Sequence, residues 1–198
     1  MEHVHQDLEF IRSVMENARK RRVVDGIHSM IWGTVVPICT ALSFWLAEVQ
    51  HPQFISLLWV LGMIFGALCS FIAGYIRTRR WGSLPSGAGS QIYYSAWIAF
   101  GIGVVGTMVA GMLGLLEIPE SLFMLAMLLA VTNTVDASFC SMNWLYFITA
   151  GWFVVAFFVL LLPMPHAAMF FGFSTIPLQW LPGWILTRIY RREIHGEI

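Results

Sequence analysis

Long apolar runs alternate with short polar breaks along almost the whole chain after residue 25. A helix that crosses a bilayer needs about 20 largely apolar residues, because ~30 Å of hydrocarbon is crossed at ~1.5 Å per residue. The fold class that the pattern predicts is therefore an all-α integral membrane bundle. We expect six membrane-spanning helices within residues 26–187, over residues 26–47, 54–76, 92–116, 121–138, 144–162 and 166–187.

Residues 1–25, which precede the first apolar run, have a different periodicity. Apolar residues recur at helical spacing on one face of residues 6–22, which predicts an amphipathic helix. We expect this helix to lie in the membrane interface, although packing on the protein's own cytoplasmic loops is an equal alternative. The basic cluster at its end is expected to contact anionic lipid headgroups, through Arg19, Lys20, Arg21 and Arg22.

The basic residues predict which way the chain is oriented. All 11 Lys and Arg residues precede the first run, follow the second run or follow the last run. Because Lys and Arg favour cytoplasmic loops, both ends of the chain are expected inside, with residues 188–198 as a cytoplasmic tail. The connections expected outside carry only acidic residues, namely Glu48, Glu117 and Glu120.

Composition supports the membrane class and excludes nucleic acid as a partner. The chain is 58% hydrophobic and 11% charged, whereas soluble domains carry about 25% charged residues. Its basic clusters are short and lie beside the apolar runs, so they do not form the basic surface that nucleic acid requires. A single Lys against ten Arg residues, together with short loops, favours a bacterial inner membrane.

Small residues recur every four positions in two of the predicted spans. This spacing places them on one helical face, and small residues allow helix backbones to approach closely in lipid. We expect the two faces to pack against each other, and a homodimer contact is the alternative. The two ladders are Gly62, Gly66, Ser70 and Gly74 in the second span, and Ser95, Ala99, Gly103, Thr107 and Gly111 in the third.

Two places could carry polar chemistry. Asp136 lies near the inner end of the fourth span, with Asn133 and Asn143 on the same side of the helix. An ionisable residue at membrane depth indicates function, but an acid at the boundary can also simply reach water, and we favour the boundary. Pro177 frees a carbonyl in the sixth span beside Gln179, which indicates either a transport path or, more simply, a packing kink.

No pattern in the sequence indicates a cofactor, a metal site or a catalytic site. His28 and His166 fall at opposite ends of their spans, whereas two haem ligands must lie at the same depth. The chain has no Gly-rich phosphate loop and no H-E-x-x-H motif. We therefore expect a protein that is not an enzyme.

The opening residues carry a resemblance to known proteins. The segment from Leu8 to Ala18, followed by a first span, resembles the start of small bacterial multi-span membrane proteins of unknown function. That resemblance implies a similar layout and no particular activity. The plan of an interfacial helix and six spans also resembles ABC-2-type permease subunits, which are usually longer and have a substantial outer segment before the last span.

Two functions remain open from the sequence. Its many packing devices and few intramembrane polar groups favour association, as an accessory or scaffold subunit of a larger membrane assembly or as a homo-oligomer. The partners would then be lipids and other membrane subunits, or a second copy of the chain. The alternative is a component of a small-solute permease, with a polar path near Asp136 and the Pro177 kink.

Overall fold

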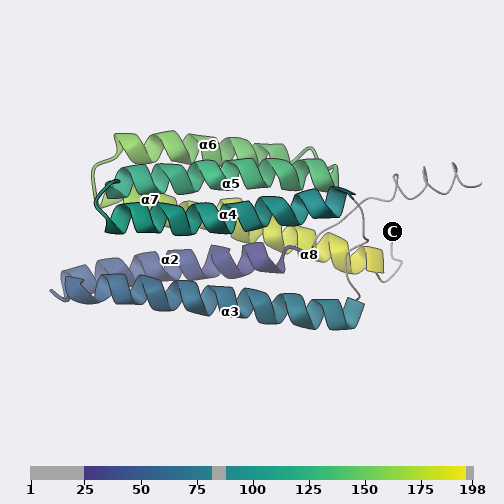
Figure 1. Cartoon of the computed structure of the whole chain (residues 1–198), viewed down its shortest axis with the longest axis horizontal. Coiled ribbons are helices and arrows are strands. Elements are labelled where there is room, and N and C mark those ends of the chain that lie inside the picture. The colour runs from purple at the N-terminus through teal and green to yellow at the C-terminus, as the bar shows by residue number, and fades with distance from the viewer. Residues whose placement is uncertain (1–24, 82–87, 195–198) are drawn as a thin grey trace, which may run out of the picture.

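The computed structural model describes residues 25–81 and 88–194, and every regular element within these ranges is a helix (Figure 1). The expected all-α class is therefore confirmed. The predicted helix over residues 6–22 and the basic cluster Arg19–Arg22 lie outside the described residues. The helices are α2 (Ile27–Glu48), a 3-10 turn η1 (Pro52–Phe54), α3 (Ile55–Trp81), α4 (Ala88–Met112), α5 (Ile118–Cys140), α6 (Leu145–Leu161), α7 (His166–Thr175), the π-helical η2 (Ile176–Trp180) and α8 (Leu181–Ile194).

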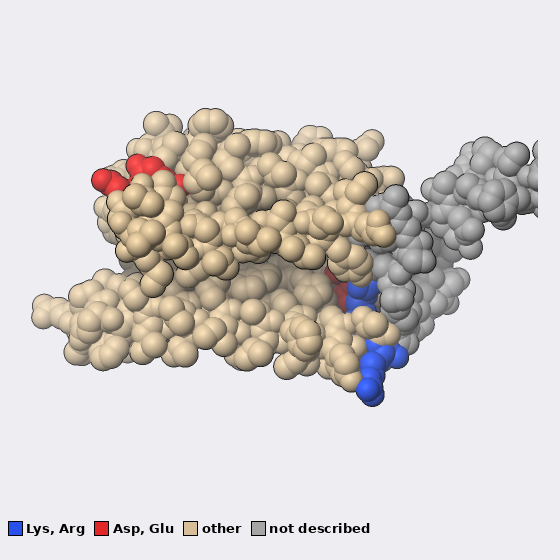
Figure 2. Space-filling view, in the orientation of Figure 1, with Lys and Arg blue, Asp and Glu red and all other residues tan. Residues whose placement is uncertain are grey.

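Four of the helical segments are long and apolar enough to cross a membrane: Ile27–Glu48, Pro52–Arg79, Gln91–Met112 and Ile118–Cys140. Large apolar side chains cover the outside of the bundle; Phe71 is 74% exposed and Phe147 is 79% exposed. Such continuous apolar surface is what a bilayer requires. On the face shown in Figure 2, acidic side chains lie at one end and basic side chains at the other, with an uncharged surface between them; a further acidic patch is visible in the hollow beside the basic side chains. The chain is a helical membrane protein.

Several helix boundaries differ from the predicted spans. Helix α3 continues to Trp81, five residues past the predicted end, and α8 continues to Ile194, so most of the predicted tail 188–198 is helical. The start and end of α4 also differ. This helix begins at Ala88 and ends at Met112, earlier at both ends than the predicted 92–116. Gly114 adopts a φ of 69° in the turn that follows, a conformation that glycine permits without steric cost. Helix α5 then begins at Ile118, so Glu120 lies in its first turn and not in a loop as predicted. An acidic residue is favourable there, because the helix dipole is positive at that end.

The predicted sixth span is not one continuous α-helix. Helix α7 ends at Thr175, and the π-helical η2 leads into α8. Pro177 lacks an N–H and cannot bond the carbonyl of Phe173, four residues earlier. The N–H of Ile176 donates to that carbonyl instead. At the expected kink the chain forms a short π-helical segment, η2, of the kind that occurs mostly as a single turn within α-helices.

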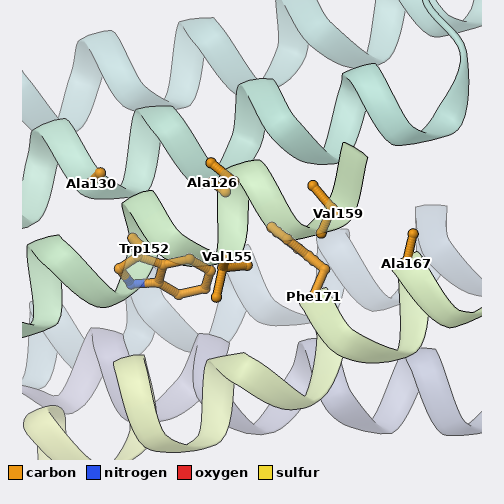
Figure 3. Packing of buried hydrophobic residues seen from close by; sticks show 8 residues of the cluster. Ala126, Ala130, Trp152, Val155, Val159, Ala167 and Phe171 are labelled. Atoms are coloured by element: carbon orange, nitrogen blue, oxygen red, sulfur yellow. The ribbon is translucent and has the colours of Figure 1, made fainter. Parts of the chain in front are cut away.

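The main core lies where α5, α6 and α7 meet (Figure 3). Ala126 and Ala130 of α5 are fully buried, and their small side chains allow α6 to approach closely. Trp152 of α6 is also fully buried, and its ring lies 5.8 Å from the ring of Phe171 on α7. In this core, large rings fill the space that alanines leave open.

The prediction that the two ladders pack against each other is wrong. The ladder of α3 faces α2: a Cβ at Gly66 would lie 2.8 Å from the ring of Trp32, and Gly62 faces Cys39. The ladder of α4 faces α5, where a Cβ at Gly103 would lie 2.8 Å from Leu128. Each small face receives a large side chain from a hairpin neighbour, which fills space better than two small faces would.

The remaining ladder residues follow the same pairing in part. Gly74 faces the ring of His28 on α2, with 3.5 Å between a Cβ there and His28 Cε1. Thr107 of α4 is buried, and its hydroxyl donates to the carbonyl of Gly103. Ser95 and Ala99 are exposed, so the ladder of α4 packs only over its second half.

The closest backbone approach joins α2 to the broken C-terminal helix. Gly26 meets Gly183, and a Cβ at Gly33 would lie 2.5 Å from the backbone nitrogen of Trp180. Farther along α2, Thr40 packs onto Gly172. The sequence did not predict this contact, because these glycines do not form a four-residue ladder.

We expect Gly33→Ala to lower the free energy of unfolding by about 1–3 kcal/mol, because the new methyl group overlaps the rigid backbone of Trp180. Gly106→Ala is the matched control, since a Cβ there meets no described atom within 4 Å. It should be neutral or slightly stabilising, as alanine favours a helix over glycine. Thermal unfolding in detergent measures both; equal effects would contradict the close contact.

Candidate functional site

A cavity of about 220 Å³ lies at the basic end of the bundle, and several polar side chains are among the residues that line it. Figure 2 shows the surface hollowed between the α2–α3 hairpin and α4, with basic side chains at one end of the hollow. Residues from α2, α3, α4, α5 and α8 converge on the cavity. They are Asp25, Gly26, His28, Ser29, Trp32, Ser70, Arg77, Tyr93, Tyr94, Trp97, Asp136, Cys140 and Leu186.

Asp136 is the carboxylate on the α4–α5 side of the cavity. It lies in the last two turns of α5, and its Oδ1 accepts a hydrogen bond of 3.0 Å from the indole Nε1 of Trp97 on α4. This bond fixes one oxygen of the carboxylate and ties α4 to α5 at their basic end. Asp136 is partly buried and borders the cavity, so the expected boundary acid lies beside a partly open hollow of the bundle.

Asp25 lies across the cavity, where the chain enters α2. Its Oδ1 accepts from the backbone N–H of Ile27 at 3.2 Å, which satisfies one of the free donors at the start of the helix. The hydroxyl of Thr187 on α8 lies 3.0 Å from the same oxygen. Asp25 therefore joins the two ends of the described chain at the cavity wall, and its role there is already structural.

Ser70 and Arg77 bring hydrogen-bond donors from α3. The Ser70 Oγ and the Arg77 Nε are both buried, and neither has a hydrogen-bond partner among the described residues. The Arg77 guanidinium lies 5.4 Å from the ring centre of Tyr190. Buried polar groups without a partner are costly in proteins. Ser70 and Arg77 both line the cavity and are therefore candidate donors to an acceptor there. Trp152 Nε1 and Gln179 Nε2 are also buried without a partner among the described residues, but neither residue lines the cavity.

Aromatic rings complete the lining. Trp32 belongs to α2, whereas Tyr93, Tyr94 and Trp97 belong to the first turns of α4. The Tyr93 ring lies 5.0 Å from that of Phe139 on α5 and 5.7 Å from that of Tyr94. These contacts hold the rings in place, so the cavity combines charged groups with fixed aromatic faces.

Of the four residues predicted to form a polar path, only Asp136 borders the cavity. Asn133 is buried, and its Nδ2 donates to the carbonyl of Leu129 at 2.8 Å within α5. Asn143 is exposed in the turn before α6. Gln179 is buried in η2, where its Nε2 has no partner among the described residues. The structure does not bring these side chains together.

The cavity residues that sequence reasoning missed had one visible signal. Aromatic residues crowd the basic ends of the predicted spans, far more than the other ends. Some of these rings line the cavity, and others pair with arginines: Arg79 lies 5.0 Å from the ring centre of Tyr75, and Arg188 lies 3.7 Å from that of Trp184. Cation–π pairing and cavity lining together account for the asymmetry.

Comparison of the chain with protein-family models, with curated proteins and with solved structures found no match. Within the described residues, no three His, Cys, Asp or Glu side chains come close enough together to hold a metal ion. The chemistry that the cavity residues can perform is therefore argued from their own groups. They offer charge, hydrogen bonding and aromatic faces, which are means of binding a solute.

We expect Asp136→Asn to change the free energy of unfolding by less than about 1 kcal/mol, because the amide oxygen still accepts from Trp97. Asp136→Leu should cost about 1–3 kcal/mol, since it leaves the indole N–H without its acceptor. Thermal unfolding in detergent separates the two variants. Asn143→Leu is a control at an exposed turn residue; equal destabilisation by Asn and Leu at position 136 would show that the hydrogen bond is not what matters.

Proposed function

We propose that the protein is a component of a small-solute permease that binds a polar solute in the cavity between the α2–α3 hairpin and α4–α5. The observation that carries this proposal is the pair of buried, unpartnered donors of Ser70 and Arg77 on the same cavity as the Asp136 carboxylate. In a helical membrane protein, ionisable side chains that meet at a cavity mark solute or ion pathways. The proposal needs no catalytic step.

We further propose that all six predicted spans cross the membrane, with both chain ends in the cytoplasm. The contacts of α2 with Gly172, Trp180 and Gly183 support this, because they run along most of a helix that is itself long enough to cross. Helix α6 is apolar but short, and it packs along α5. The basic residues that the structure describes lie near the C-terminal ends of α3 and α8, at the cavity end of the bundle. In this arrangement that end would face the cytoplasm.

Reporter fusions after Ile198 and within residues 113–117 should report opposite compartments, with the C-terminal reporter in the cytoplasm. The reason is that an odd number of crossings separates the turn after α4 from the C-terminus in a six-span chain. A fusion within residues 82–87 should agree with the C-terminal one. Equal compartments for the first two fusions would rule out the six-span arrangement.

Transport can be tested in proteoliposomes by recording currents or radiolabel uptake with a set of amino acids, amines and organic acids. We expect uptake of at least one of them, reduced about tenfold or more by Asp136→Asn, because a charge-assisted hydrogen bond to the solute is lost. Glu117→Gln is the matched control, since this acid lies at the opposite end of the bundle, before α5. Because the chain carries the whole cavity, we expect it to transport without other subunits, and no uptake of any solute by the wild-type protein would overturn the proposal.

Association is the second candidate function, as an accessory or scaffold subunit or as a homo-oligomer. It is favoured by the outer face of α4, where a Cβ at Gly101 or Gly106 meets no described atom within 4 Å. Small residues open to lipid allow another helix to approach closely. Transport separates the two candidates: a protein that works only by association gives no uptake by itself, whereas the permease component does.

A further inference from the structure

The two sides of the cavity carry opposite chemistry. On the α3 side, Arg77 supplies a positive charge and an unpartnered Nε–H, and Ser70 supplies an unpartnered hydroxyl. Asp25 is a second acid at the same cavity. Its Oδ1 accepts from the N–H of Ile27, and the Thr187 hydroxyl lies 3.0 Å from that oxygen and 2.8 Å from the carbonyl of Gly183.

On the α4–α5 side, Asp136 supplies a carboxyl group among aromatic rings. Trp97 holds one of its oxygens, and Tyr93 and Tyr94 line the same side of the cavity. A carboxylate beside aromatic faces is a favourable environment for an ammonium group, because both the charge and the ring quadrupoles attract it. The donors of α3 are, by contrast, suited to a carboxylate or a phosphate.

We propose that the solute is a small zwitterion, with its anionic group at Arg77 and Ser70 and its ammonium group at Asp136 and the rings of α4. This inference rests on the proposed function, because it names the class of solute for that same cavity. A solute with one charged group satisfies one side only and leaves the partly buried group on the other side without a partner, which is unfavourable. A zwitterion satisfies both sides at once.

The size of the cavity sets the scale of the solute. A cavity of about 150 Å³ holds benzene, so about 220 Å³ suits a molecule somewhat larger than that. Phosphoethanolamine has this size and carries an ammonium and a phosphate. The same pair of groups occurs in a free solute and in the headgroup of phosphatidylethanolamine, and both can be tested.

The test uses the full-length protein in nanodiscs of phosphatidylglycerol, with binding measured by calorimetry. We expect phosphoethanolamine to bind at least about tenfold more tightly than ethanolamine or inorganic phosphate, because each of these carries only one of its two charged groups. Adding phosphatidylethanolamine to the nanodiscs distinguishes the sources. Weaker apparent binding of phosphoethanolamine identifies the lipid headgroup as the occupant, and unchanged binding identifies a free solute.

Two variants assign the charges to the two sides. In Arg77→Met, phosphoethanolamine should bind only as tightly as ethanolamine does, and the affinity for ethanolamine should not change. In Asp136→Asn, phosphoethanolamine should bind only as tightly as inorganic phosphate does, and the affinity for phosphate should not change. If either residue had only a structural role, its replacement would lower the affinity for all three ligands by the same factor. Arg79→Met is the matched control for Arg77, because Arg79 is exposed and lies over Tyr75 outside the cavity.

The outcomes that overturn the inference differ from those that overturn the proposed function. Ethanolamine or phosphate binding as tightly as phosphoethanolamine shows that the site recognises one charge only, so the zwitterion is wrong and the permease component stands. If none of the three ligands binds but another solute enters proteoliposomes, the proposal of a zwitterionic solute is wrong and the proposal of a permease component is kept. If none binds and no solute enters, both proposals fail.

Discussion

The contact between α2 and the broken C-terminal helix holds the two parts of the bundle together. The hairpin of α2 and α3 joins the rest of the described chain mainly through α2, which packs on α7, η2 and α8. In lipid, no hydrophobic effect drives helices together, so close van der Waals packing must supply the attraction. Gly26, Gly33, Gly172 and Gly183 permit that packing. The cavity exists because this seam fixes the hairpin beside α4 and α5.

Periodicity and hydropathy predicted the all-α class well, because each helix satisfies its own backbone hydrogen bonds, whichever neighbour it finds. Periodicity and hydropathy did not predict which helices pack against each other. A small-residue ladder indicates a face that another helix can approach, but not which helix. Trp32 and Leu128 decide that choice, and their fit against Gly66 and Gly103 is a property of shapes in three dimensions. The π-helical segment at Pro177 illustrates the same limit, since a proline predicts an interruption but not its geometry.

The candidate site was predictable only in part for a related reason. Asp136 stands out in the sequence because it is an acid within an apolar run. Its partner Trp97 is 39 residues away and looks like any interfacial tryptophan. Asp25, Ser70 and Arg77 lie near the ends of spans, where polar residues are common, and only the fold brings them to one cavity. A site formed by residues that are each common in membrane proteins has no sequence motif from which it could be predicted.

Helices α3 and α4 do not pack directly against each other, and this affects how a molecule can reach the cavity. The two helices form the rims of the hollow in Figure 2, and each is fastened to a different neighbour, α3 to α2 and α4 to α5. Their separation can therefore change without rearranging the core of Ala126, Trp152 and Phe171. In the six-span arrangement proposed above, the hollow between these rims opens sideways toward the bilayer. An amphiphile would then be able to place its head at the cavity while its tail stays in lipid.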